Sequence, residues 1–305
     1  MENPMSEDKK SPVISKRTDF VLLFDVKDGN PNGDPDMANS PRFDPETFQG
    51  LVSDVALKRK IRDWVFAKAG ENGTLKPGYD VFVLQGHSLE SRQKMAFEGS
   101  GLKKGATDAK TVDSARAWMC GNFFDVRTFG AVMSTTDYNC GQVRGAVQVT
   151  FARSFDRVLT MEHAITRVAY TKQEKLESTS GRTEMGNKHT VAYGLYLAHG
   201  FINPNLAQPP NGTGFTEEDQ RLLFDALINM WDLDRSAARG LMAPRKIYGF
   251  EHESKLGNFP AHKLFDRLKV RRKEGIETPR SFDDYVVSLD EANLPPGVTI
   301  KRIFE

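Results

Sequence analysis

Cysteine is scarce in this sequence. Cys120 and Cys140 show no spacing typical of a metal site, and two cysteines among 305 residues indicate a reducing compartment. The sequence also lacks a signal peptide and any apolar run long enough to cross a bilayer. These absences argue against a disulfide-stabilised secreted domain and against a membrane-spanning protein.

Net charge is nearly absent as well. Lysine and arginine number 42 and aspartate and glutamate 41, so the formal net charge at pH 7 is +1. No global field therefore draws the protein to nucleic acid, and binding to a polyanion must come from local clusters of cations. With 39% hydrophobic and 27% charged residues, the composition is typical of a globular protein that buries a core.

Motifs of several common enzyme classes are missing. The sequence contains no GxxxxGK phosphate loop, no dinucleotide-binding fingerprint, no GxSxG nucleophile setting and no internal repeat. The six histidines show no metal-ligand spacing, and most are interpreted as hydrogen-bonded structural residues. These patterns therefore predict neither a catalytic centre nor a cofactor.

What the sequence does contain is an organised stretch from residue 19 to residue 64. Apolar side chains alternate along 20–26, the period-two pattern of a strand, and recur at helical spacing along 57–65. Between them, KDGNPNGDPD breaks the strand, because Gly and Asn tolerate positive φ and Pro cannot continue a ladder. The stretch therefore predicts a strand, a polar loop and a helix.

Cations cluster on this predicted helix. Lys58 and Arg62, four residues apart, are expected side by side at the edge of the apolar stripe, with Arg59 beyond them. A polar loop at a strand end, followed by adjacent cations on a rigid helix, is well suited to hold a phosphodiester backbone. A charged stretch on an amphipathic helix is more often only its solvated face, and that alternative stays open.

The remaining chain predicts alternating strands and helices. We expect strands at 79–84, 141–154, 244–254, 284–289 and 297–304, and helices at 109–120, 216–234 and 259–275. Residues 88–110 are polar and read as a partly helical insertion. Two β-prone segments, 158–171 and 189–202, are joined by a polar excursion and predict a projecting hairpin. The order favours an α+β fold with large insertions.

The loop at 28–39 allows three interpretations. Its Asp, Asn and Gly residues imitate the spacing of a calcium loop, but the twelfth position is Asn39 instead of Glu. The same carboxylates could hold Mg²⁺ for phosphodiester cleavage, which makes a metal-dependent ribonuclease built on Asp25, Asp28 and Asp34 a rival hypothesis. The simplest alternative is a structured turn in which Asn and Asp side chains satisfy the backbone.

Several segments together resemble one known family. They are FVLLFDVKDGNPNGDPD (20–36), SDVALKRKIRDW (53–64), DVRTFGAVM (125–133), VRGAVQVTFARS (143–154), EHAITRVAYT (162–171), MGNKHTVAYGLY (185–196) and FEHESKLGNFPAHKLF (250–265). This combination resembles the crRNA-binding backbone subunit of type I-C CRISPR Cascade complexes, the Cas-seven family. The likeness covers most of the chain, from about residue 20 to beyond residue 265.

The resemblance implies a fold and a function. The fold would be α+β, a single modified RRM-like (ferredoxin-like) palm over 1–305, with a finger insertion at about 86–120 and a thumb hairpin at about 171–190. The chain would not be an enzyme and would need no cofactor or metal. Copies would polymerise along one crRNA in the prokaryotic cytoplasm, and each thumb would kink the guide at a regular interval.

The resemblance also implies partners. They would be crRNA, target DNA, further copies of the chain in a helical filament, and the other type I-C Cascade subunits, namely the Cas-five and Cas-eight families and the small subunit. Cutting in this antiviral defence would be done by a separately recruited helicase–nuclease, and no membrane would be involved. Related type III subunits cut RNA with an acidic residue after the first strand, so the ribonuclease alternative stays open.

Carried over residue by residue, the resemblance predicts an RNA-binding site. Lys58, Arg59 and Arg62 would contact crRNA phosphates. Asn30, Asn32 and Gly33 would line the same groove, and Arg127 and Arg144 would add backbone contacts. In the thumb, Met185 next to Gly186 would be the apolar wedge, with Lys188 and His189 at its base.

Overall fold

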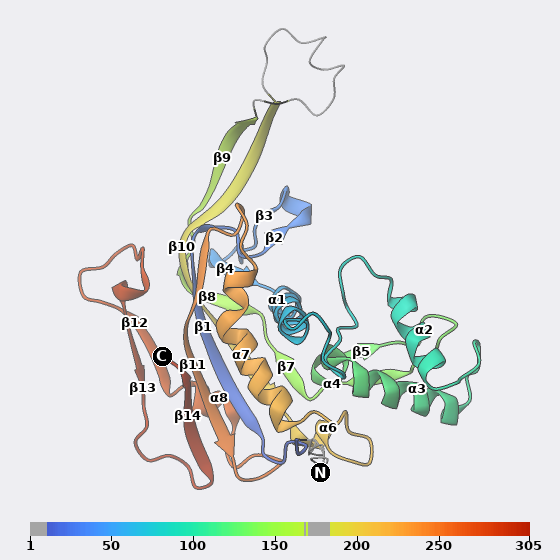
Figure 1. The fold of residues 1–305 in the computed structure, drawn as a ribbon. Coiled ribbons are helices and arrows are strands. Elements are labelled where there is room, and N and C mark those ends of the chain that lie inside the picture. Colours follow the sequence, from blue (N-terminus) through green and yellow to red (C-terminus); the bar gives the residue numbers. More distant parts are fainter. Residues whose placement is uncertain (1–10, 168, 170–183) are drawn as a thin grey trace, which may run out of the picture.

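A large antiparallel sheet forms the centre of the molecule (Figure 1). The computed structural model describes residues 11–167, 169 and 184–305. Long strands lie side by side in the middle, and the strand order is β14-β11-β1-β10-β8-β4, with β7 also paired to β10. Their bounds are β1 (Thr18–Gly29), β4 (Gln49–Val52), β7 (Val147–Val149), β8 (Ala152–Arg157), β10 (Glu184–Ile202), β11 (Leu241–His252) and β14 (Val298–Phe304).

Both faces of this sheet are covered. Alternate residues of β1, such as Phe20 and Phe24, pack on one face under helices α1 (Asp54–Ala69) and α7 (Glu217–Leu233). The residues between them, Val21 and Leu23, pack on the other face under β12 (Leu268–Arg272) and β13 (Tyr285–Leu289), with α8 (Ala261–Phe265) nearby. The alternation predicted for 20–26 is therefore confirmed. Both sets of alternating side chains are apolar because both faces of the strand are buried.

The chain passes through the centre in the order β1, α1, β8, β10, α7, β11. The four strands of this series lie side by side as β11-β1-β10-β8. Helix α7 begins with the predicted capping box, in which Thr216 and Asp219 bind each other's backbone N–H groups. The predicted α+β class is confirmed in its coarse form, as helices packed on a large antiparallel sheet.

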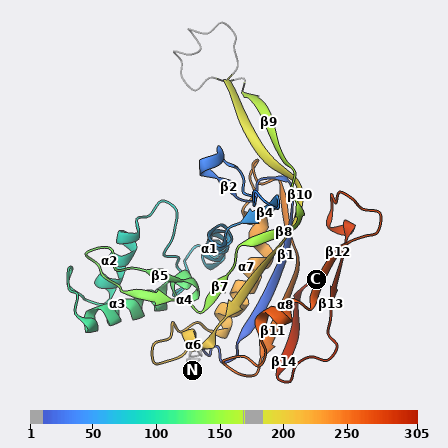
Figure 2. The ribbon, with the colours of Figure 1, turned by 180° about the vertical axis from the view of Figure 1, so that it is seen from behind.

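A helical protrusion extends from one side of the sheet (Figures 1 and 2). It contains α2 (Leu89–Gly99), α3 (Ala109–Asn122), α4 (Phe124–Phe129), β5 (Gly130–Val132) and β6 (Gln142–Arg144). Buried residues from Phe82 to Cys140 form a core of its own. Asp108 caps α3 as predicted, by accepting from Thr111 N. This protrusion includes the predicted finger insertion at 86–120 but continues well beyond it.

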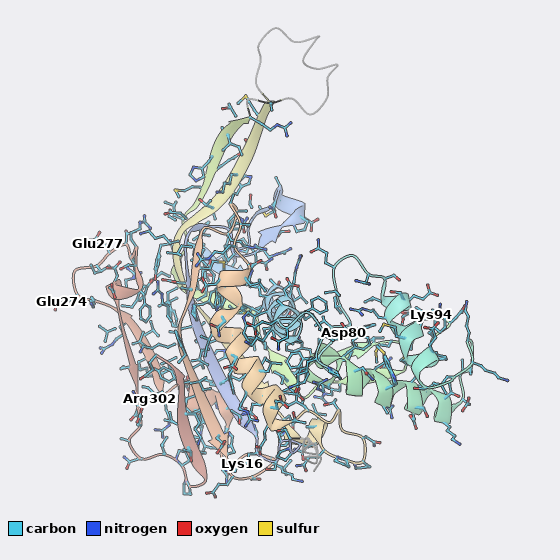
Figure 3. The ribbon with its side chains drawn as sticks, viewed as in Figure 1. Lys16, Asp80, Lys94, Glu274, Glu277 and Arg302 are labelled. Atoms are coloured by element: carbon cyan, nitrogen blue, oxygen red, sulfur yellow. The ribbon has the colours of Figure 1, made fainter. Side chains whose placement is uncertain are left out.

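The predicted strand at 79–84 is wrong. Only Asp80 forms a bridge there, with Phe123, and the neighbouring residues run in turns. The backbone N–H groups of Phe82 and Val83 donate to the buried carboxylate of Asp125, at 2.7 and 3.1 Å, instead of to a strand. Asp80, labelled in Figure 3, forms an ion pair with Arg92 of α2 at 2.8 Å.

A hairpin projects from the end of the sheet (Figure 1). Strand β9 (Thr160–Arg167) pairs with the first part of β10, from Thr160 opposite Val191 to Arg167 opposite Glu184. The two β-prone segments therefore form the two paired strands of the expected projecting hairpin. Of the predicted thumb at 171–190, residues 171–183 lie outside the described residues.

The expected helix at 259–275 ends early. Helix α8 stops at Phe265, and the basic run that follows lies in strand β12. Leu268 and Val270 pack inward while Lys269 and Arg271 point outward, so the run has strand periodicity. Glu274 and Glu277 lie in the connection from β12 to β13 (Figure 3). The expected closing strands β13 and β14 are present.

Short elements complete the fold. They are β2 (Gly33–Asp34), η1 (Pro35–Met37), β3 (Ser40–Pro41), α6 (Pro204–Ala207) and η2 (Phe282–Asp284). Within the described ranges, no helix combines the length and apolar character needed to span a bilayer.

Candidate nucleic-acid interface

The loop after β1 is fixed from two sides. Asn30 is buried, and its side chain donates to Asn39 O at 2.7 Å while its backbone N–H donates to Ala238 O at 2.7 Å. A Cβ on Gly29 would lie 1.9 Å from Arg239 O, so only glycine allows this close approach. Asn30 therefore supports the loop from inside, and the structured-turn interpretation describes it well.

Asn32 joins this loop to the start of α1. Its Oδ1 accepts from both the backbone N–H and the hydroxyl of Ser53, at 2.9 and 2.8 Å, and Ser53 caps α1. A Cβ on Gly33 would lie 1.9 Å from Asn39 Oδ1, so Gly33 is also a close-packing position. The predicted loop and the predicted helix are thus brought together as one rigid unit.

The three predicted helix cations differ in their surroundings. Arg62 is 12% exposed and donates to Asp125 at 2.7 Å, while Lys58 bonds Asp54 at 2.9 Å. Both lie over the ring of Phe129, with 5.4 and 5.6 Å to its centroid, so they are side by side as predicted. Arg59 is 63% exposed, and its partners among the described residues are Asp63 at 3.5 Å and the amide of Gln85. Arg59 is therefore the cation of this group that faces solvent.

Sequence reasoning missed a second cluster of cations beside the loop. Lys60 of α1 and Arg239 both contact the carboxylate of Asp234, and Arg239 also donates to Asn30 O at 3.0 Å. Burial is the main cause that lowers the pKa of Lys60, and the charges of Arg239 and Arg59 lower it further, against the attraction of Asp63. Burial and Arg59 likewise lower the pKa of Arg239. Positive charge is therefore in local excess around Lys60 and Arg239. In the sequence, only the run KRK at 58–60 indicated this cluster.

Arg127 does not fit the predicted role. It is 6% exposed and donates to Asp219 at 2.9 and 2.7 Å and to Gly78 O at 2.6 Å. With its guanidinium occupied inside the protein, it is not accessible to a phosphate. Arg144, in contrast, is exposed on β6 opposite Gly130 and has no ion pair among the residues that the structure describes.

The predicted thumb residues lie on the two faces of the hairpin arm. Met185 is 74% exposed, and His189 follows on the same face because side chains alternate along a strand. Gly186 and Lys188 belong to the opposite face, where Gly186 lies across from Ile165, itself exposed. The structure therefore separates Lys188 from His189, which the sequence had placed together.

The predicted acidic residues each have a separate environment. Burial raises the pKa of Asp25, which binds the hydroxyl of Tyr193 at 3.0 Å and Arg245 at 2.9 Å. Asp34 accepts from Asp36 N and pairs with Arg42, and Asp28 is exposed. Over the described residues, no three acidic, histidine or cysteine side chains gather in a way that could hold a metal ion. Asp25, Asp28 and Asp34, which the ribonuclease hypothesis named, are therefore not brought together in one cluster.

Comparison of the sequence with known proteins identifies the family of the chain. The sequence profile described as CRISPR-associated protein Cas7 matches residues 16–290, most of the chain. The chain belongs to the Cas7 family. A CRISPR-associated protein Cas7 of Haloferax volcanii is 26% identical over 295 residues, which cover 90% of this chain and 81% of the archaeal one. The Cas-seven resemblance is therefore confirmed at the level of the family.

Solved structures with a similar chain include CRISPR assemblies. A chain of a CRISPR RNA-guided surveillance complex in a pre-nicking state is 15% identical, with a TM-score of 0.47 over 77% of this Cas7 chain and 75% of that chain. A chain of the type III-B Cmr-beta complex bound to cognate target RNA is 12% identical, with a TM-score of 0.40 over 76% and 60%. The family assignment rests on the sequence match.

Proposed function

We propose that this Cas7 family member is a non-catalytic subunit that polymerises along crRNA and forms the backbone of a type I-C CRISPR Cascade complex. In this function it holds the guide for pairing with target DNA in antiviral defence. The other Cascade subunits and further copies of the chain are its partners, and cutting belongs to a separately recruited helicase–nuclease. The family assignment supports the general role in this proposal. The type I-C subtype is proposed from the segments that resemble type I-C subunits.

The proposed fold is a modified RRM-like palm with finger and thumb insertions. The series β1, α1, β8, β10, α7, β11 and the strand order β11-β1-β10-β8 support it, because they match a ferredoxin-like βαββαβ unit. In ordinary RRMs, bases stack on the sheet face that lacks helices. Here β12 and β13 cover that face, so the guide is proposed to run along the loop after β1, helix α1 and the hairpin.

The observation that carries the proposal is the projecting hairpin. Its arms stand clear of the sheet and expose large apolar side chains, with Met185 on one face and Ile165 on the other. Exposed apolar side chains on such an arm are suited to contact bases or a neighbouring copy. Lys188 and His189, one on each face of the arm, are proposed to meet the guide backbone below the wedge.

The proposed phosphate contacts are graded by exposure. Arg59 and Arg144 project into solvent and are the first candidates. Lys58 is only 13% exposed and holds Asp54 at 2.9 Å, so it ranks below Arg59 and Arg144. Arg62 is proposed to hold α1 against the protrusion through Asp125, and Arg127 is left out of the interface. A binder that ignores guide sequence should hold phosphates in this way and leave base edges free.

Replacing Arg59 by alanine tests the phosphate contact. We expect weaker binding to single-stranded guide RNA and a plot of log affinity against log salt that is flatter by roughly 0.7. Fluorescence anisotropy at several salt concentrations measures both. Arg302→Ala is the matched control, because Arg302 is a similarly exposed arginine on β14 (Figure 3) and should leave the slope unchanged. An unchanged slope for Arg59→Ala removes α1 from the proposed groove.

A further inference from the structure

Phe48 combines an exposed aromatic ring with a backbone that phenylalanine rarely adopts. Its φ is +58°, and its side chain is 49% exposed. A bulky side chain in the left-handed region costs of order 1–3 kcal/mol, which glycine or asparagine at the same position would largely avoid. About half of the residue stays exposed, so burial offsets only part of that strain, and the exposed part of the ring is available to a ligand.

The turn that carries Phe48 is firmly held. Phe48 N donates to Asp44 O at 2.7 Å, and Asp44 Oδ1 accepts from Glu46 N at 3.0 Å. Asp44 also binds Arg153 at 2.6 Å, and Val158 N donates to Phe48 O at 2.9 Å. The backbone that carries the ring is therefore held in place before any ligand arrives, which reduces the entropy lost on binding.

Two groups complete a platform around this ring. Phe43 stacks nearly parallel to Phe48, with 6.0 Å between centroids and 10° between planes. The guanidinium of Arg157 lies 5.9 Å from the centroid of the Phe48 ring. Arg157 is exposed, and no carboxylate pairs with it in the part of the chain that the structure describes. An aromatic surface next to a free cation matches a nucleobase next to its phosphate.

The platform lies at the root of the hairpin. Arg157 ends β8, Val158 is bonded to Phe48, and the arm β9 begins at Thr160. Thr166, which pairs with Met185, is about 20 Å farther along this arm at the usual rise of a strand. Phe48 thus lies at the root of the hairpin and Met185 farther out along it, a separation that several nucleotides of an extended strand would span.

We propose that Phe48 stacks on an unpaired nucleobase of single-stranded RNA while Arg157 binds the adjoining phosphate. This inference rests on the proposed function and adds a base-stacking site to it. Stacking on an aromatic ring tolerates any base, so the site suits a guide whose sequence varies. Phe151 offers a contrast: it is 56% exposed, but its backbone is ordinary and no cation lies over its ring among the described residues.

Replacing Phe48 by glycine distinguishes the contribution of the ring to binding from the contribution of the turn to stability. Phe48→Gly should relieve the backbone strain, so the melting temperature should stay the same or rise. Affinity for single-stranded RNA should fall about fivefold to a hundredfold. Phe48→Leu keeps the apolar bulk and the left-handed backbone but removes the aromatic face, and it should lose affinity to a similar degree. Phe48→Tyr and the control Phe151→Ala should bind within twofold of the original chain.

The measurement is fluorescence anisotropy with a labelled RNA of mixed sequence, together with quenching of 2-aminopurine placed along it. If the wild-type chain binds RNA and both Phe48→Gly and Phe48→Leu bind it with the same affinity, the stacking site is overturned and the proposed function stays intact. A wild-type chain that binds no RNA overturns both. If light scattering shows that Phe48→Gly loses self-association without RNA, the ring belongs to a protein contact and the stacking site is overturned.

Discussion

Replacing Arg127 by methionine is expected to lower the free energy of unfolding by about 3–5 kcal/mol. Methionine keeps much of the packing volume but leaves Asp219, which is 1% exposed, without its charged partner. The carbonyl of Gly78 also loses its donor. Urea unfolding followed by circular dichroism measures the loss.

Two variants show whether the effect comes from the buried pair. In Arg127→Met/Asp219→Asn, the amide can still cap α7 while the unpaired charge is gone, so part of the stability should return. Arg144→Met, on an exposed arginine of the same protrusion, should change stability by no more than about 0.5 kcal/mol. A loss below 1 kcal/mol for Arg127→Met would contradict a structural role and reopen its assignment to RNA.

Removing the hairpin is expected to abolish assembly on long guides while leaving the fold intact. Residues 161–190 can be replaced by Asn-Gly, because Thr160 and Val191 already pair and Ala192 N donates to Leu159 O at 3.1 Å. Most side chains of β9 are exposed, so the core loses little. If each hairpin engages the neighbouring copy, affinity for a long guide should fall by roughly 10²–10⁴, the usual gain from linked binding.

The comparison with a short guide makes this result specific. On an RNA that accommodates one copy, the shortened chain should lose far less affinity than on an RNA that accommodates many. Gel mobility on both lengths measures the difference, and a thermal melt checks the fold. Cooperative assembly of the shortened chain on the long guide would contradict the role of the hairpin.

Local rules predicted the elements whose signals are local. The alternation in 20–26, the cap at Asp108 and the capping box of Thr216 with Asp219 all depend on residues a few positions apart, and all are present. The strand expected at 79–84 failed because its backbone donors are satisfied by Asp125, more than forty residues away. Its β-prone composition carried no information about that carboxylate.

The candidate site was predicted in outline but not in its details. Which cations are exposed depends on distant acids: Asp125 takes Arg62, and Asp219 takes Arg127 from 92 residues away. Arg239 joins the cluster through Asp234 and the loop carbonyl of Asn30, and nothing in its own segment indicates this. The left-handed backbone of Phe48 is equally invisible in DPETFQ, because that residue type does not favour it.

Copies of this chain are proposed to add in register along one guide RNA. Native mass spectrometry of the purified protein with RNAs of increasing length tests it most directly. We expect each fixed increment of RNA length to add one more copy of the protein. A single bound copy at every RNA length, or no binding at low salt, would contradict it.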